Sequence, residues 1–256
     1  MDFNLNSNIK GEGQSLILLH GLFGSADNLG RIATELSNDY KVHALDLRNH
    51  GQSFHSDEMD YALMAQDVID YMDASAIESA CFLGHSMGGK VAMTIALDFP
   101  ERVTKLIVAD IAPVTYPAHH HEIFSGLLAI NLARDKTRIE ADKVLAEYVS
   151  ETGIRQFLLK NLQAVSGGGL KWRLNLNAIH DNYQNILQGM NVDKVFKGSV
   201  LFIAGALSDY IKPEYKEKTL KLFPNTQMKV IPEASHWLHA EKPRIFIGIC
   251  KRFLEE

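Results

Sequence analysis

One serine stands at the centre of a glycine cluster and is a candidate nucleophile. Residues 81–90 read CFLGHSMGGK, so that Ser86 lies between Gly84 and Gly88 in a G-x-S-x-G pattern. An apolar run precedes the pattern and a helical pattern follows it, which is the setting of a nucleophile elbow. Such a turn lifts the hydroxyl clear of a sheet and aims the first N–H groups of the next helix at an oxyanion. The alternative is a glycine-rich turn with an incidental serine.

A second glycine-containing turn follows the first apolar run of the chain. Residues 20–25 read HGLFGS. Acyl transfer needs two backbone N–H donors aimed at the developing oxyanion. Met87, directly after the serine, is expected to supply one donor, and Leu22 or Phe23 the other. An ordinary strand-to-helix turn is the alternative interpretation.

A nucleophilic serine needs a base, and His236 in EASHWLHAEKP (233–243) is the best placed histidine. It follows the last expected strand, from where it reaches across the carboxyl end of a sheet to Ser86. His239 is the near alternative, and both histidines could instead lie on the surface. His85 is an unlikely base because neighbours on a tight turn point apart.

The acid that would orient the histidine has two candidates. Asp110 ends the apolar run LIVADI, directly after the elbow helix, and a carboxylate there would be costly to bury without a partner such as His236. Asp209 lies in IAGALSDYIKP, where Ser208 stands three residues after Gly205. We favour Asp110, with Ser208 as a supporting hydrogen-bond partner, and keep Asp209 as the alternative acid. Either choice gives the chain order Ser, Asp, His.

Other polar residues are interpreted as structural. Asp46 and Arg48 lie in ALDLRNHGQS, and Arg48 is expected to join loops near the oxyanion turn. The three histidines at 119–121 are expected in a solvated loop, because consecutive residues cannot all face one metal ion. Cys81 and Cys250 lie in apolar segments and are expected to be buried free thiols.

The elements that must position these residues alternate between apolar β-type runs and helical patterns. This alternation predicts βαβ units, and hence a mostly parallel central sheet flanked by helices. The expected strands cover 15–21, 41–47, 80–86, 105–111, 199–206 and 227–234. The expected helices cover 27–37, 61–73, 87–99, about 214–222 and the stretch after Pro243.

Residues 113–190 break this alternation and read as helical segments without a convincing buried strand. They are expected to form a helical cap inserted into a core made of 1–112 and 191–256. Each large apolar residue of the insertion, taken alone, is better explained as part of the core of the cap than as a ligand contact. Together, these residues are expected to cover the pocket and shape an acyl site. They are Phe124, Leu127, Leu128, Phe157, Leu158 and Trp172.

The overall composition is that of an ordinary globular protein. The chain has 256 residues, 46% of them apolar and 22% charged, and a net charge of −5. No Lys/Arg run suggests nucleic-acid binding, and no apolar run approaches the ~18 residues of a membrane span. The N-terminus lacks the pattern of a signal peptide, so a cytoplasmic location is expected. Neither a metal nor an organic cofactor is implied.

Together, these motifs make the chain resemble the α/β-hydrolase superfamily along its whole length. The segments HGLFGS, DLRNHGQS, GHSMGG and SHWLHAEKP occur in the order of that family. The segments DNLG, RNHG, AQD, DIAPV and QFLLKNL further resemble the bacterial YbfF-type esterases. That resemblance implies a triad whose acid is Asp110, with Ser208 joining its network. The carboxylate of Asp209 beside Ser208 departs from the pattern of that group, so Asp209 remains an alternative triad acid.

The expected function is a serine carboxylic-ester hydrolase that acts through an acyl-serine intermediate. Small to medium acyl esters, or acyl thioesters, would be the substrates, and water would be the second substrate. Carbon–carbon bond hydrolases and cofactor-free haloperoxidases use the same triad and are the enzymatic alternatives. Epoxide hydrolases and haloalkane dehalogenases are disfavoured because their elbow carries aspartate where Ser86 stands. A catalytically dead binding protein is the alternative of another class.

Overall fold

A twisted central sheet organises the protein. The computed structural model describes residues 5–133, 137–190 and 193–256. The main sheet has the order β1-β3-β2-β4-β5-β8-β9, and only β1 runs antiparallel to its neighbour. Its strands are β1 (Ser7–Lys10), β2 (Ser15–Leu19), β3 (Lys41–Leu45), β4 (Ala80–His85), β5 (Val103–Ala109), β8 (Ser199–Gly205) and β9 (Thr226–Ile231).

The six parallel strands are those expected from the apolar runs, and β1 is an addition. Every residue of β4 is buried, as is all of β8 after its first residue, because helices cover both faces of the sheet. In contrast, β1 is an edge strand whose last three residues are exposed. It therefore carries no apolar run from which a strand could be predicted.

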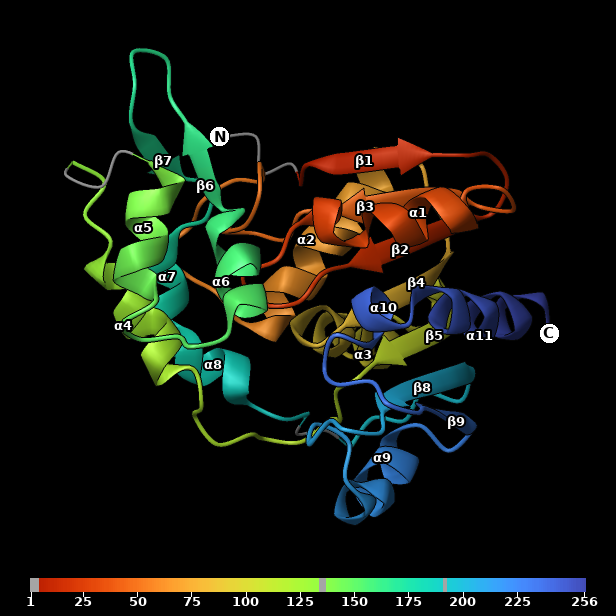
Figure 1. Ribbon diagram of the computed structural model, residues 1–256. Coiled ribbons are helices and arrows are strands. Elements are labelled where there is room, and N and C mark those ends of the chain that lie inside the picture. Colours follow the sequence, from red (N-terminus) through yellow and green to blue (C-terminus); the bar gives the residue numbers. More distant parts are fainter. Residues whose placement is uncertain (1–4, 134–136, 191–192) are drawn as a thin grey trace.

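Helices cover the two faces of the sheet in separate groups (Figure 1). On one face, α1 (Gly30–Leu36) packs against α11 (Pro243–Glu255), with α10 (Leu238–Glu241) leading into it. On the other face, α3 (Met87–Asp98) packs on β4 and β5 and against α2 (Tyr61–Ala74), while α9 (Lys216–Leu222) adds to the same apolar cluster. Short 3₁₀ turns, η1 (Ala26–Leu29), η2 (Pro100–Arg102) and η3 (Pro213–Tyr215), complete the connections.

The segment between β5 and β8 gathers at one end of the sheet, far from the C-terminal end of α11 (Figure 1). It contains five short helices in its described residues: α4 (His121–Ala129), α5 (Arg138–Leu145), α6 (Thr152–Leu159), α7 (Leu176–Asp181) and α8 (Tyr183–Leu187). A small hairpin of β6 (Leu162–Ala164) and β7 (Leu170–Trp172) turns at the glycines 167–169, all of which have positive φ. The insertion thus contains two strands, but neither is a buried strand of the main sheet.

The limits expected for the core and the cap are consistent with this arrangement but remain a proposal. Residue 113 follows β5 closely, and residue 190 precedes β8 by a short linker. The expected restart of the core at residue 191, like residues 1–4 of the core, lies outside the described residues.

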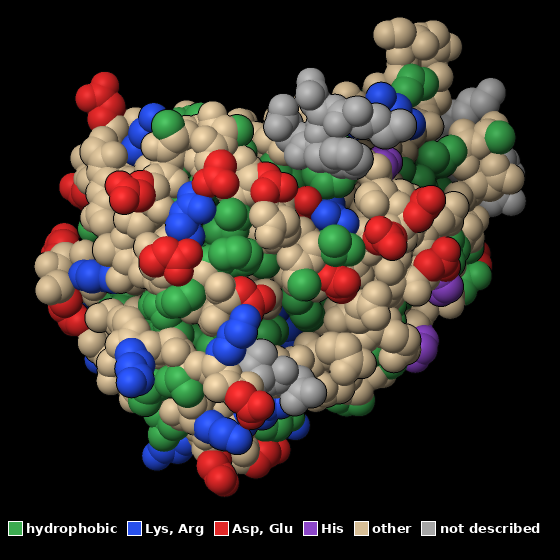
Figure 2. Space-filling view, turned by 180° about the vertical axis from the view of Figure 1, so that it is seen from behind, with side chains coloured by type: hydrophobic (Ala, Val, Ile, Leu, Met, Phe, Trp, Pro, Cys, Tyr) green, Lys and Arg blue, Asp and Glu red, His purple; other side chains and the backbone are tan. Residues whose placement is uncertain are grey.

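The surface carries charges of both signs. On the face shown in Figure 2, lysine and arginine side chains are interspersed with aspartate and glutamate. Among the helices in the described part of the chain, none is long and apolar enough to cross a bilayer.

Candidate active site

Ser86 lies on a strained turn between β4 and α3. Its φ of 53° and ψ of −118° fall in a region that non-glycine residues rarely occupy. Close packing explains the glycines around it, because a Cβ atom on Gly84 would come within 2.2 Å of the carbonyl oxygen of Gly88. A Cβ atom on Gly88 would in turn come within 2.3 Å of the carbonyl oxygen of Leu19 on β2. The turn therefore has the form of the expected nucleophile elbow.

His236 connects Ser86 to Asp110. Its Nε2 lies 3.0 Å from Ser86 Oγ, and its Nδ1 lies 2.7 Å from Asp110 Oδ2. The three residues follow β4, β5 and β9, whose carboxyl ends lie at the same edge of the sheet. This arrangement allows His236 to accept the serine proton while its other nitrogen donates to the carboxylate.

Asp110 is fully buried, and its carboxylate is hydrogen-bonded on both oxygens. Oδ1 accepts from the backbone N–H of Gly205 at 2.9 Å, and Oδ2 accepts from the Ser208 hydroxyl as well as from His236. These donors offset the cost of burying the charge. The side chain of Asp209 is 94% exposed and lies 3.7 Å from Lys212. The structure thus brings Asp110, and not Asp209, to the histidine.

The backbone around Leu22 distinguishes the two oxyanion candidates. The N–H of Phe23 donates to His50 Nε2 at 3.2 Å, and His50 Nδ1 lies 2.9 Å from the Arg48 carbonyl oxygen, to which it donates. Burial lowers the pKa of His50 to about 3, which keeps Nε2 available as an acceptor. The N–H of Phe23 therefore already has an acceptor and is not available to an oxyanion.

The N–H groups of Leu22 and Met87 remain free for an oxyanion. Within the described residues, neither group donates a hydrogen bond to the protein. Met87 is buried and directly follows Ser86, whereas Leu22 is half-buried and lines the same pocket as Ser86. Two such donors without a protein partner favour an anion-binding role. His50 itself was missed by sequence reasoning, since no local pattern links it to Phe23.

His85 and His239 lie behind His236 and make no hydrogen bond to Ser86 in the described structure. His85 Nε2 donates to the backbone oxygen of His236 at 2.9 Å, and burial lowers the pKa of His85. His239 is buried, its ring centroid lies 4.3 Å from that of His85, and burial lowers its pKa to about 4. Both rings are therefore neutral supports of the loop that carries His236.

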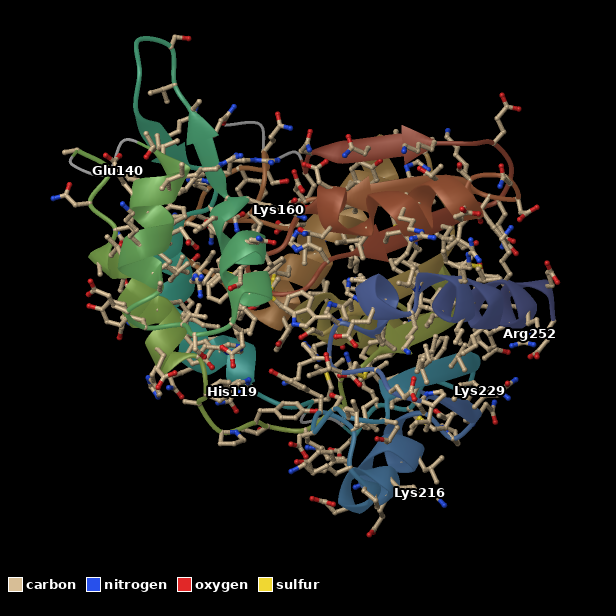
Figure 3. The ribbon with its side chains drawn as sticks, viewed as in Figure 1. His119, Glu140, Lys160, Lys216, Lys229 and Arg252 are labelled. Carbon is tan, nitrogen blue, oxygen red and sulfur yellow. The ribbon has the colours of Figure 1, made fainter. Side chains whose placement is uncertain are left out.

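The prediction of a solvated loop at 119–121 is confirmed for His119 and His121, which are exposed, but not for His120, which is half-buried. His119 Nε2 lies 2.5 Å from the Tyr210 hydroxyl, and His120 Nδ1 lies 2.7 Å from the Tyr183 hydroxyl. Both side chains line the pocket at Ser86, and Figure 3 labels His119 beside α8, on the segment that leads to α4. They bind tyrosines of other elements, which the local sequence does not reveal. No metal-binding group is found among the described residues.

Tyr210 is a further residue that the sequence did not indicate. Its ring stacks on that of His236 with centroids 3.9 Å apart and planes 21° from parallel. Its backbone N–H donates to Ser208 Oγ at 3.3 Å. The ring therefore holds one face of the histidine while the backbone supports the group that binds Asp110.

A pocket of about 280 Å³ opens in front of Ser86. Phe157 and Leu158 of the insertion line it, as expected, together with Ile123 and Ile154. The remaining apolar residues expected there have other positions. Phe124 and Leu127 are buried within the insertion, Leu128 is 46% exposed, and Trp172 lies half-buried on the hairpin.

Arg48 has a structural role, but at a different place from the one expected. Its guanidinium forms a two-pronged ion pair with Asp67 on α2, at 2.6 and 2.7 Å. It does not tie the oxyanion turn, which is instead held by Asp46 through Ala26 N at 2.7 Å and by His50.

The two cysteines are buried free thiols, as expected. Burial raises the pKa of Cys81 to about 11 and also raises the pKa of Cys250. Both groups are therefore protonated and unreactive near neutral pH.

Comparisons with known proteins agree with this fold. A family model described as the alpha/beta hydrolase fold matches residues 14–243. The chain is 40% identical to Esterase YbfF of Escherichia coli over 94% of its own length and 93% of that protein. It is 37% identical to an sn-1-specific diacylglycerol lipase of Mus musculus, over 94% of the chain and 80% of that protein. A solved structure titled "Marine microorganism esterase" superimposes with a TM-score of 0.96 at 40% identity, covering 98% of this chain and 100% of the other.

Proposed function

Since the chain belongs to the α/β-hydrolase family and is an esterase/lipase-type enzyme, we propose that it is a serine carboxylic-ester hydrolase with Ser86 as its nucleophile. The observation that carries the proposal is the continuous hydrogen-bonded line from Ser86 Oγ through His236 to Asp110, with distances of 3.0 and 2.7 Å.

Acylation is the first half of the proposed reaction. His236 takes the proton from Ser86 Oγ as the oxygen attacks the ester carbonyl carbon. The carbonyl oxygen becomes the oxyanion and accepts from the N–H groups of Leu22 and Met87. Collapse of the tetrahedral intermediate breaks the carbon–oxygen bond of the ester, and the departing alcohol takes the proton from His236. An acyl-serine remains.

Deacylation repeats these steps with water. His236 removes a proton from the water molecule that attacks the acyl carbon, and returns it to Ser86 Oγ as the acid product leaves. Asp110 fixes the orientation of the imidazole and stabilises its protonated form in both halves. Ser208 donates to the same carboxylate and keeps it turned toward the histidine.

The proposal extends to the arrangement of the chain. Residues 113–190 act as a cap that covers the site, and the pocket under it receives an acyl ester. No metal or organic cofactor enters any step. A cytoplasmic location remains a prediction from the sequence. The names of the relatives include both an esterase and a lipase, so they do not fix the length of the acyl chain.

Labelling with a fluorophosphonate probe tests the nucleophile. The folded protein should acquire one probe adduct, which peptide mass spectrometry should place on Ser86. The Ser86→Ala variant should remain unlabelled and should lose about 10⁶-fold in kcat on an activated ester. A folded protein that hydrolyses esters while Ser86 stays unmodified would overturn the proposal.

A further inference from the structure

The cavity at Ser86 has two lobes that meet at the serine. A larger lobe has a volume of about 280 Å³, and a smaller one has a volume of about 30 Å³. Five residues form walls of both lobes and so mark the passage between them: Leu22, Ser86, His119, His120 and Tyr210. An ester bound at Ser86 must place its acyl chain and its alcohol part on different sides of the reacting carbon.

The position of His236 decides which part enters which lobe. Of the two lobes, only the larger one counts His236 among its walls. The leaving alcohol must take its proton from His236, and the water of the second half-reaction must give its proton to the same nitrogen. Both the alcohol part and the attacking water therefore belong in the larger lobe. The acyl chain is left with the smaller lobe.

The smaller lobe admits only a short chain. A cavity of ~10–15 Å³ holds about one water molecule, so 30 Å³ accommodates about two or three atoms heavier than hydrogen. Its walls come from α2, α3 and α8 and from the segment after β5, and they are rigidly held. Tyr61 OH donates to the Ile186 backbone oxygen at 2.6 Å, and Tyr116 OH donates to the Tyr210 backbone oxygen at 2.5 Å.

The buried amino group of Lys90 closes one side of this lobe. Lys90 Nζ donates to the backbone oxygens of Leu187 and Gln188 at 3.2 and 2.5 Å. It also lies 5.3 Å from the ring centroid of Tyr61 and 4.9 Å from that of Tyr116. Pushing an alkyl chain past this group would break the hydrogen bonds of a polar side chain that is 1% exposed, which is costly.

We infer that the enzyme is selective for esters of short acyl groups, of about two or three carbons, whose acyl chain enters the lobe between α2, α3 and α8, while the alcohol part enters the larger apolar lobe. This inference rests on the proposed function and deepens it. It narrows the small to medium acyl range expected from the sequence to its short end. It also makes Ile186 and Leu187 residues that determine acyl length, and Ile123 a residue that contacts the alcohol.

Two ester series test the inference on the intact protein. In the first, p-nitrophenyl acetate, propionate, butyrate, hexanoate and octanoate share one leaving group. We expect kcat/KM to fall about tenfold or more for each methylene beyond the capacity of the small lobe. In the second series, methyl, butyl, hexyl and octyl acetates share one acyl group. We expect kcat/KM to hold or rise with the length of the alcohol, because the larger lobe has room for it.

Matched variants separate the two lobes. Ile186→Ala enlarges the small lobe and should move the best acyl chain to butyrate or hexanoate, with little change in the alcohol series. Ile123→Ala enlarges the other lobe and should change the alcohol series only. Leu187→Ala is a second enlargement of the small lobe, should Ile186→Ala fail to fold. Fluorophosphonate labelling of Ser86 reports for each variant whether the site is intact.

The outcomes distinguish this inference from the proposed function. The inference would be overturned if the wild type hydrolysed the octanoate ester as fast as the acetate ester. It would also be overturned if the acyl preference changed in Ile123→Ala and not in Ile186→Ala. In both cases, labelling of Ser86 would leave the proposed function standing. Absence of labelling at Ser86 in an active wild-type protein would overturn both.

Discussion

The carboxyl edge of the sheet and the inserted segment contribute to the same pocket in different ways. At the sheet edge, Phe23, Ser86 and Asp110 all have positive φ, and each residue takes part in a hydrogen bond that is buried or partly buried. The insertion contributes apolar walls from helices of five to nine residues. Strained backbone thus occurs at the residues proposed to place the reacting atoms, and the surrounding contacts are what maintain it.

This difference assigns separate tasks to the two regions. Reacting groups require fixed distances, which the ends of neighbouring parallel strands supply. Substrate shape requires only walls, and short helices that pack on one another supply these. We therefore expect changes at the sheet edge to affect kcat, and changes in the insertion to affect the choice of substrate.

The two aspartates considered as the triad acid provide the largest test of the sheet edge. Asp110→Asn keeps the shape of the side chain but removes the charge that orients the imidazole, so kcat on p-nitrophenyl acetate should fall about 10⁴-fold. Asp209→Asn, at a side chain that is 94% exposed, should stay near the wild-type rate. A large loss in Asp209→Asn together with a nearly normal Asp110→Asn would show that the triad acid is wrongly assigned.

The ion pair of Arg48 and Asp67 tests how firmly the core holds the loop after β3. Both side chains are 8% exposed. Arg48→Met leaves a buried carboxylate without its cation and should lower the free energy of unfolding by about 3–5 kcal/mol, measured by urea denaturation. Burial raises the pKa of Asp67, and a protonated carboxyl is cheaper to bury. Loss of Arg48 removes the contacts that lower this pKa, so the pKa of Asp67 is higher still in the variant, and the deficit should shrink as the pH falls through it.

A surface pair serves as the control for this variant. Lys194 Nζ lies 2.7 Å from Asp98, but its side chain is 57% exposed. Lys194→Met should change the free energy of unfolding by less than about 1 kcal/mol. Equal losses in the two variants would contradict the view that the buried pair anchors the core.

Ser86 and His236 could be predicted from the sequence because each stands in a recognisable local setting. The serine lies between glycines at a strand-to-helix junction, and the histidine follows the last strand. The sequence favoured Asp110 over Asp209 as the acid but did not decide between them. The choice depends on the loop conformation, including the φ of 53° at Asp110. The family assignment needed only the order of the motifs along the chain.

The residues that were missed act through contacts between distant parts of the chain. His50 binds the backbone of Phe23, 27 positions away, and Tyr210 binds His119, 91 positions away. Neither contact leaves a local pattern, since each depends on where a loop returns to the sheet edge. For the same reason, the two lobes of the pocket could not be foreseen. Their volumes depend on how α8 packs against α2 and α3.

Lys90 tests the junction between the sheet domain and the insertion. Burial lowers its pKa to about 7, against ~10.4 in an unfolded chain. Between these values the unfolded state binds the additional proton, so stability rises with pH across this window. The free energy of unfolding of the wild type, relative to Lys90→Met, should therefore increase by up to about 4 kcal/mol from pH 7 to pH 10. Urea titrations at pH 6, 8 and 9.5 measure it.

The exposed Lys229 of β9 supplies the control for this pH dependence. Lys229→Met should follow the wild-type pH dependence in parallel. If Lys90→Met also runs parallel to the wild type, the lysine is not held in the buried position beside the small lobe and α8.

Two polar contacts join the insertion to the loops at residues 20–30, and their removal is expected to give the smallest losses of stability. They allow a buried contact to be compared with an exposed one. Asn161 Nδ2 donates to the Phe23 backbone oxygen at 2.8 Å and is buried, whereas Arg173 lies 3.3 Å from an Asp27 side chain that is 64% exposed. Asn161→Ala should cost about 1–3 kcal/mol of unfolding free energy because it leaves a buried carbonyl without a donor. Arg173→Gln should cost less than about 1 kcal/mol.

The same pair of variants asks whether the insertion influences the oxyanion turn. Asn161 holds the carbonyl of Phe23, and the N–H of Phe23 is held by His50, so the peptide groups on both sides of this residue are fixed from different regions. Releasing one side should let the N–H of Leu22 drift, and kcat should fall in Asn161→Ala while Arg173→Gln stays within about twofold of wild type. An unchanged kcat in Asn161→Ala would mean that the sheet edge positions the oxyanion donors without the insertion, and the separation of tasks would then be complete.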